Sequence, residues 1–307
     1  MRTSLFYHMT AQVLRVLPRK AIGQAIGRIA QWSWPKPLGN VVVRLYTRAF
    51  GVNLNESVKE HDFESFDDFF TRSLQDGARP LDPHEQVVVS PADGRIESIE
   101  RIDQETTTFR VKGALYRVED LLGEPEESRR YAGGTGCVIY LSPKDYHRVH
   151  SPVSGHLVRV HSMEGDYLPV NPIGAPFFKD LLVRNRRVAL TIDTPSESRL
   201  GRVTVVMVAA MIVGRITVKG FEQRDVPFGL HHVSPPLPIQ RGEELGIFHL
   251  GSTAVLLLEQ SASTHWLCTE GSIRVGGAIA QGEEGAGKPS RIRSKTKGGT
   301  QRKNHGA

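Results

Sequence analysis

The sequence predicts an α+β protein in which amphipathic helices precede a mainly antiparallel β core and a disordered basic tail follows it. In the middle of the chain, short apolar and β-branched runs are separated by glycine and proline, with no long helices alternating between them. The N-terminal region instead carries apolar side chains at helical spacing. From Gly282 the chain is rich in Gly, Lys and Arg and loses apolar periodicity. We therefore expect three regions, 1–50, 51–281 and 282–307, around one substantial core.

The N-terminal region is expected to form three helices. Apolar faces over 5–17, 22–32 and 38–50 are separated by proline-containing breaks. Such helices can pack on the core as a helical subdomain, or they can lie at a membrane interface. The absence of acidic residues and the presence of aromatic residues such as Trp32 and Trp34 favour the interfacial interpretation. The two interpretations are compatible.

The net charge of +6 conceals a segregation of charge along the chain. Residues 1–50 carry eight Lys/Arg and no Asp or Glu, and residues 286–307 carry seven more without an acid. Removing these 15 from the 39 basic residues leaves 24 against 33 acidic residues, a net of −9 for 51–285. A nucleic-acid-binding protein would concentrate positive charge on its folded domain. The pattern favours an anionic membrane surface as partner of the N-terminal region and argues against nucleic acid.

The β core is expected from ten runs of β-type residues. These are 87–89, 95–99, 107–111, 137–141, 157–161, 188–192, 203–213, 216–218, 247–250 and 254–258. The longest apolar run is about half of the roughly 20 residues that a bilayer span requires, and no signal peptide is recognisable. A short helix is expected after Ser65, because acids follow it in the first turn. Cys137 and Cys268 suit a reducing compartment, so the protein is expected inside the cell.

Three short segments carry residue types that suit chemistry. Asp93 lies in a Pro-Ala-Asp-Gly turn, His147 and His150 stand three apart between two prolines, and Gly251-Ser252 precedes an apolar strand. Each segment also has an ordinary structural interpretation. Asp93 followed by glycine is typical of a turn, and Gly251-Ser252 is typical of a turn that precedes a strand. The two histidines could be half of a metal site, but no companion ligand pair completes it and no metal is expected.

Together the three segments resemble the phosphatidylserine decarboxylase family. Its markers are a Pro-Ala-Asp-Gly turn, a Tyr-His-Arg-Val-His segment and a Leu-Gly-Ser-Thr motif, which stand here at 91–94, 146–150 and 250–253. They occur in the same order and at similar separations. The resemblance covers roughly 40–280, while the N-terminal helices match only in character and the basic tail is not covered. His249 is a local peculiarity to which the resemblance assigns no role.

The resemblance implies a proenzyme that cleaves itself between Gly251 and Ser252 into a β chain, 1–251, and an α chain, 252–307. The Ser252 hydroxyl attacks the carbonyl of Gly251, and the missing Cβ of Gly251 permits the strained geometry that this attack needs. The ester formed by this shift eliminates to dehydroalanine, which hydrolyses to a pyruvoyl group and ammonia. The pyruvoyl group derived from Ser252 is then the covalent cofactor.

The resemblance also implies a role for each polar residue. His150 is the base that activates Ser252, and Asp93 is the carboxylate that orients this base. Phosphatidylserine forms a Schiff base with the pyruvoyl group and loses CO2, and His147 is the candidate donor of the proton that replaces it. Hydrolysis releases phosphatidylethanolamine. The chain is thus expected to be a carboxy-lyase of phospholipid biosynthesis, a homodimer, and a peripheral protein on the cytoplasmic side of the cell membrane.

Two other classes of function remain open from the residues alone. Asp93, His150 and Ser252 follow the chain order of one serine hydrolase fold, although Ser252 lies outside a Gly-x-Ser-x-Gly segment. A β-rich lipid-binding module would account for the basic helices but not for the segments 146–150 and 250–253. Whether the peptide bond before Ser252 is intact in the purified protein distinguishes the three.

Overall fold

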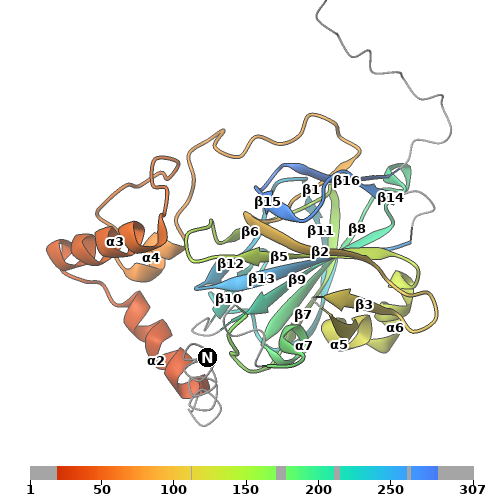
Figure 1. The fold of residues 1–307 in the computed structure, drawn as a ribbon, viewed down its shortest axis with the longest axis horizontal. Helices are drawn as coiled ribbons and strands as arrows, with labels where there is room; N and C mark the ends of the chain where they lie inside the picture. The colour runs from red at the N-terminus through yellow and green to blue at the C-terminus, as the bar shows by residue number, and fades with distance from the viewer. Residues whose placement is uncertain (1–18, 112, 171–177, 211–214, 261–263, 283–307) are drawn as a thin grey trace, which may run out of the picture.

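A computed structural model of the chain describes residues 19–111, 113–170, 178–210, 215–260 and 264–282. It confirms a mainly antiparallel β protein with few helices (Figure 1). The helix expected over 5–17 lies outside the described residues, and so does the expected disordered tail except for its first residue, Gly282, which is the last residue of a strand. None of the helices in the described part of the chain is long and apolar enough to span a membrane.

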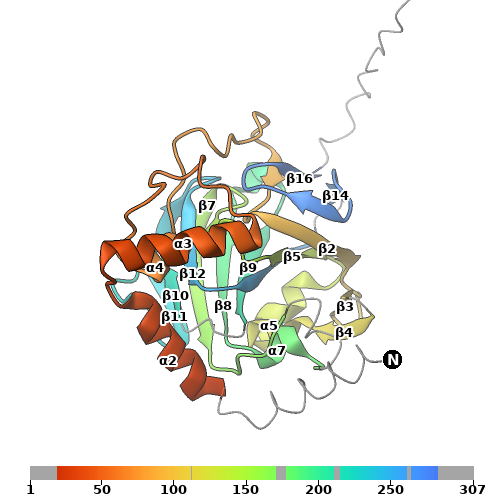
Figure 2. The ribbon, with the colours of Figure 1, turned by 60° about the vertical axis from the view of Figure 1, so that its left-hand side comes forward.

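Three N-terminal helices lie together on one side of the β body (Figures 1 and 2). They are α2 (Arg19–Gln31), α3 (Lys36–Phe50) and α4 (Phe66–Phe70). Proline begins α3 and Gly51, with a φ of 71°, ends it, as the conformational freedom of glycine allows. The Ser65 side chain accepts a hydrogen bond from the N–H of Asp68 at 3.1 Å and begins α4, which confirms the helix expected after this residue.

The β body is built on one sheet of eight antiparallel strands in the order β11-β7-β8-β9-β13-β5-β2-β15. These strands are β2 (Gly94–Arg101), β5 (Thr135–Leu141), β7 (Gly155–Met163), β8 (Arg187–Asp193), β9 (Arg202–Ala209), β11 (Gly229–Ile239), β13 (Ser252–Leu258) and β15 (Gly271–Ile273). A second sheet has the order β10-β12-β6, with β6 (Arg148–His150), β10 (Arg215–Val218) and β12 (Glu244–His249). Its strand β12 is followed after the two residues Leu250 and Gly251 by β13 of the large sheet.

The remaining elements are a small sheet, a hairpin, three short helices and two 3-10 turns. They are the sheet of β1 (Val87–Val89), β14 (Thr264–Trp266) and β16 (Ala278–Gly282), the hairpin of β3 (Thr108–Val111) and β4 (Ala114–Arg117), the helices α5 (Val118–Leu122), α6 (Pro125–Ser128) and α7 (Leu181–Arg184), and the short 3-10 turns at Arg129–Tyr131 and Ser196–Ser198. The helices α5 and α7 and the β3–β4 hairpin contribute to a core on one face of the large sheet, and α3 and α4 contribute to a core on the other.

All ten expected β-runs coincide at least in part with strands, but the short strands β4, β6, β14, β15 and β16 and the long strand β11 were not predicted. The most informative of these is β11. It contains three prolines and most of its side chains are exposed, so it lacks the apolar run that identified the others. The position of β11 at the edge of the large sheet explains why proline is tolerated there, because one side of an edge strand makes no ladder hydrogen bonds.

Candidate active site

Ser252 is the first residue of β13, which lies in the middle of the eight-stranded sheet. It pairs with Leu141 of β5 on one side and with Ala209 of β9 on the other. Only 1% of its surface is exposed, and its Oγ has no hydrogen-bond partner among the described residues. A buried hydroxyl without a partner costs about 1–3 kcal/mol. Thr47, Ser98 and Ser162 also have buried hydroxyls without partners, so this state gains meaning at Ser252 only together with the backbone turn that precedes it.

The turn that precedes Ser252 holds the backbone in an unusual conformation. β12 ends at His249, and Leu250 and Gly251 then have φ angles of 89° and 20°. A positive φ costs a leucine on the order of 1–3 kcal/mol, because its Cβ approaches the backbone, whereas glycine tolerates it. A Cβ on Gly251 would meet no atom within 4 Å, so its backbone angle, and not crowding, favours glycine here. The strain therefore lies next to the bond expected to break.

Asp93 lies in the turn before β2 and is 6% exposed. Its carboxylate accepts two hydrogen bonds from Nε of Arg79, at 2.9 and 3.0 Å, and one from Nη2 at 2.5 Å. The N–H of Val275 donates to the same carboxylate at 2.8 Å. The turn depends on Gly94, since a Cβ there would lie 2.3 Å from the carbonyl oxygen of Tyr140. Asp93 is thus held as an ion-paired carboxylate, and Arg79 is its principal partner.

His150, on β6, has both ring nitrogens engaged. Its Nδ1 lies 2.8 Å from the carbonyl oxygen of Gly242, and its Nε2 lies 3.1 Å from the hydroxyl of Tyr146. A carbonyl can only accept, so Nδ1 carries the hydrogen and Nε2 keeps a lone pair toward Tyr146. Burial lowers the pKa of His150, although the Gly242 hydrogen bond and the charge of Glu244 oppose this effect. We infer a neutral ring whose basic nitrogen faces a tyrosine hydroxyl.

His147 is fully buried and has one free nitrogen. Its Nδ1 donates to the carbonyl oxygen of Asp145 at 2.8 Å, and its ring packs on Phe70 with the ring centres 4.1 Å apart. Its Nε2 is buried without a hydrogen-bond partner among the described residues. Burial lowers the pKa of His147 to about 3, so the ring is neutral near pH 7 and this nitrogen carries an unused lone pair.

The structure places Asp93 near His150, but hydrogen bonds join none of the expected residues, and the cavity that Asp93 lines includes neither Ser252 nor the two histidines. Among the described residues, no hydrogen bond links Asp93 to His150, and none links Ser252 to either histidine. Asp93 is still near enough for its charge to raise the pKa of His150. Asp93 and Tyr146 also line one cavity of about 1020 Å³. The expected order of Asp93, His150 and Ser252 in a relay therefore stays a prediction.

Sequence reasoning missed a buried pair beside the cleavage turn. His249 Nδ1 lies 2.9 and 3.0 Å from the two carboxylate oxygens of Asp67, and its Nε2 lies 2.8 Å from Oγ1 of Thr217. Burial raises the pKa of Asp67, but the hydrogen bond from His249 and the charges of Arg215 and Arg224 outweigh it and leave the pKa lowered. The contact fixes the end of β12 just before Leu250. No sequence signal links residues 182 positions apart.

Comparison with known proteins identifies the family. The family model described as "Phosphatidylserine decarboxylase" matches residues 66–283. A phosphatidylserine decarboxylase proenzyme of Anaeromyxobacter sp. (strain K) is 35% identical over 254 residues, which cover 80% of this chain and 88% of the relative. One from Myxococcus xanthus (strain DK1622) is 35% identical over 277 residues, 87% of this chain and 96% of the relative. One from Psychrobacter arcticus is 34% identical over 257 residues, 82% and 90%.

The matched region contains the buried Ser252, the strained turn before it and the two histidines of the site. The matches extend over most of this chain and most of each relative. This chain belongs to the phosphatidylserine decarboxylase family.

Proposed function

We propose that this chain is a phosphatidylserine decarboxylase proenzyme that cleaves itself between Gly251 and Ser252. The observation that carries the proposal is the buried, unpartnered Ser252 hydroxyl directly after the strained Leu250–Gly251 turn, in a chain of this family. The mature enzyme would consist of residues 1–251 and 252–307 and would convert phosphatidylserine to phosphatidylethanolamine and CO2. A serine hydrolase finds no support, because the family match is to decarboxylases and the Asp93 carboxylate binds Arg79.

The residues around Ser252 fit the pyruvoyl group that the family implies. The position is the first residue of a central strand, where the group would be screened from water, and His147, with its unpartnered Nε2, directly precedes β6 of the second sheet. The pyruvoyl carbonyl, once formed, supplies the electron sink that decarboxylation requires.

The protein side chains would move protons in both reactions. His150 would accept the proton of the Ser252 hydroxyl, for which Nε2 has to give up its hydrogen bond with Tyr146. Asp93 would act through its charge and through the turn that it holds with Arg79. His147 is neutral at rest, so it would first take up at Nε2 a proton that the substrate's ammonium group gives up on condensation, and would then donate it to the former α-carbon.

The mass of the purified protein tests the proposal. We expect two chains that correspond to 1–251 and 252–307, and an N-terminus of the shorter chain that resists Edman degradation, because a pyruvoyl group has no amine. We also expect release of CO2 from phosphatidylserine. A single intact chain of 307 residues that decarboxylates phosphatidylserine would contradict the proposed mechanism.

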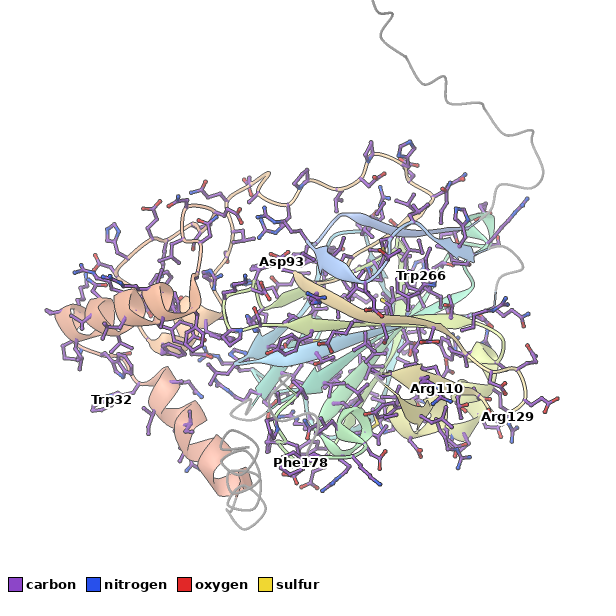
Figure 3. All side chains as sticks on the ribbon, in the orientation of Figure 1. Trp32, Asp93, Arg110, Arg129, Phe178 and Trp266 are labelled. Atoms are coloured by element: carbon purple, nitrogen blue, oxygen red, sulfur yellow. The ribbon has the colours of Figure 1, made fainter. Side chains whose placement is uncertain are left out.

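We further propose that residues 1–50 hold the enzyme at the cytoplasmic side of the cell membrane. Half of the large exposed apolar side chains of the described residues lie on α2, on α3 or between them: Ile29, Trp32, Leu38, Val41, Leu45 and Phe50. Figure 3 shows Trp32 on the helical side of the molecule, away from the β body, and 69% of its surface is exposed. Exposed Arg28, Arg44 and Arg48 add positive charge. Apolar burial and attraction to anionic lipid would act together.

Vesicle co-sedimentation tests this membrane contact. Ser252→Ala protein should bind anionic vesicles, and deletion of residues 1–35 should weaken binding at both low and high salt. Trp32→Ser should weaken binding, whereas Leu115→Ser, a matched change at an apolar side chain that is 56% exposed on β4, should not. Equal binding by the full-length and the truncated protein would show that these helices only pack on the core.

The boundaries of the three regions, 1–50, 51–281 and 282–307, and a homodimeric state are part of the same proposal. The two chains of one precursor would stay together, because β13 belongs to the 252–307 chain and lies between β9 and β5 of the 1–251 chain. Its seven residues are all buried. Separation would expose this strand and both its neighbours, which is why cleavage should not release the shorter chain.

A further inference from the structure

Arg72, just after α4, is a buried cation without a carboxylate partner. It is 6% exposed, and its Nη2 donates to the carbonyl oxygens of Lys144 and Asp145 at 3.1 and 3.5 Å. Its guanidinium carbon lies 5.7 Å from the centre of the Phe69 ring. Its Nε is buried and has no hydrogen-bond partner, and among the described residues no carboxylate forms an ion pair with it. Burial lowers the pKa of Arg72, although the charge of Asp93, which lies near it without forming an ion pair, opposes this effect.

Two other buried arginines show how unusual this arrangement is. Arg186, 1% exposed, is paired with the carboxylate of Asp225, with an Nη2–Oδ1 distance of 2.6 Å. Arg187, 8% exposed, has no carboxylate but donates from all three of its nitrogens to backbone carbonyl oxygens. Arg72 differs from both, since it forms no ion pair with a described carboxylate and its only hydrogen bonds to described residues are those from Nη2. The charge of Arg72 is therefore available to an anion that is not part of the described chain.

Arg72 lies near Asp93 and contacts the loop that carries His147. Arg72 lines the cavity of about 1020 Å³ together with Asp93, Tyr146 and Lys144. The Asp93 carboxylate is already bound by Arg79, and Lys144 is exposed and forms no ion pair with a described residue. The carbonyl of Asp145 accepts from Arg72 and also from Nδ1 of His147. An anion bound by Arg72 would thus lie next to the residue proposed to move the proton.

We propose that Arg72, assisted by Lys144, binds the phosphodiester of the phosphatidylserine headgroup in this cavity. The inference rests on the proposed decarboxylase function. The headgroup has a second anion, the carboxylate that leaves as CO2. An arginine bound to that carboxylate would stabilise the ground state more than the transition state, in which the negative charge leaves it, and would slow the reaction. The phosphodiester keeps its charge throughout, so a cation there contributes binding without opposing the chemistry. Arginine is well suited to a phosphate, because its planar fork can donate two hydrogen bonds.

The test uses soluble headgroups as competitive inhibitors of the mature enzyme with phosphatidylserine in mixed micelles. Glycerophosphoserine carries both anions, and glycerophosphoethanolamine carries the phosphodiester alone. In Arg72→Gln we expect the Ki of both to rise about tenfold to a hundredfold, as for loss of a hydrogen bond to a charged group. Lys144→Gln should give a smaller rise. Arg110→Gln is the matched control, because Arg110 lines the same cavity but lies on the β3–β4 hairpin away from Asp93 (Figure 3), and both Ki values should stay unchanged.

The outcomes separate this inference from the proposed function. A rise for glycerophosphoserine alone would show that Arg72 binds the carboxylate, and no rise for either compound would also overturn the proposal. Inorganic phosphate that competes as strongly as glycerophosphoserine would indicate a site for free anions instead of the headgroup. If Arg72→Gln does not mature, Arg72→Lys decides the question, with a several-fold rise expected for both compounds. If the wild-type enzyme does not decarboxylate phosphatidylserine, the proposed function fails, whatever Arg72 does.

Discussion

Ser252 and His147 differ from Asp93 and His150 in the hydrogen bonding of their polar groups. At Ser252 and His147, the Oγ and the Nε2 are buried and have no partners among the described residues. At Asp93 and His150, the carboxylate and both ring nitrogens are occupied by Arg79, Gly242 and Tyr146. The first pair carries the cost of desolvated groups that are not used in the resting structure, and the second pair does not.

The difference indicates a division of labour. Groups without partners can accept a new bond or proton without first breaking an old one, so Ser252 and His147 are prepared for reaction. Groups that are tied to the chain hold their orientation and their charge, so Asp93 and His150 shape the site before any proton moves. His150 has to exchange its hydrogen bond with Tyr146 if it is to act as a base. Substitutions in the two groups should therefore have different consequences.

The largest effect is expected from Ser252→Ala, which removes the nucleophile. This protein should remain a single chain indefinitely, as followed by mass spectrometry over time. Ser162→Ala is the matched control, because Ser162 is 2% exposed and its Oγ is also buried without a partner, but it lies within β7 away from a strained turn. The control should mature like the wild type. Cleavage in Ser252→Ala would show that Ser252 is not the nucleophile. Loss of cleavage in Ser162→Ala would show that the strained turn before Ser252 is not what distinguishes the two serines.

The second prediction is that the two histidines act at different stages, His150 in self-cleavage and His147 in decarboxylation. His150→Ala and Asp93→Ala should slow cleavage by about 10²- to 10⁴-fold, as expected for loss of a general base and of the group that orients it. His147→Ala should cleave at least in part yet lose decarboxylation, measured as CO2 release per mature chain. His147→Ala thus serves as the control for the two cleavage variants, and they serve as controls for it. A His147→Ala enzyme with normal cleavage and full decarboxylation would show that His147 does not move the proton.

The buried neutral His147 should also affect stability as a function of pH. Its pKa is lowered to about 3 in the folded state, against about 6.5 for an ordinary histidine, so the unfolded chain binds the additional proton between these values. Folding is therefore weakened as the pH falls from about 6.5 toward 3, by up to about 1.4 kcal/mol per pH unit, and the full contribution is present above pH 6.5. The difference between Ser252→Ala and Ser252→Ala/His147→Gln in urea unfolding at pH 7, 6, 5 and 4 isolates this histidine. Parallel pH dependences would mean that His147 is not buried in its neutral form.

The smallest effect is expected from Tyr146→Phe, which removes the hydroxyl that faces His150. Loss of one hydrogen bond of about 1 kcal/mol predicts a change of roughly fivefold in the cleavage rate, with folding preserved. Tyr140→Phe is the control, because this residue lines the same cavity and its hydroxyl makes no hydrogen bond with a described residue. Cleavage rates of Tyr146→Phe and Tyr140→Phe that agree within error would show that Tyr146 does not position His150.

Several features of this protein could be predicted from the sequence. β-branched runs between Gly and Pro predicted the strands of the core, since apolar periodicity directly reflects which side chains are buried. Ser65 and the acids after it predicted the start of α4. The order of the three motifs predicted the family that the comparison shows, and with it the residues proposed for the chemistry.

The partners of these residues were decided only by the tertiary structure. Arg79 binds Asp93, and Asp67 binds His249 across 182 positions of the chain, because the fold of the strands and α4 brings them together. The unpartnered state of Ser252 Oγ, His147 Nε2 and Arg72 Nε likewise depends on which neighbours fill the space around them. Residue types specify what hydrogen bonds a side chain can make, but burial and the arrangement of neighbouring strands decide which of them it does make.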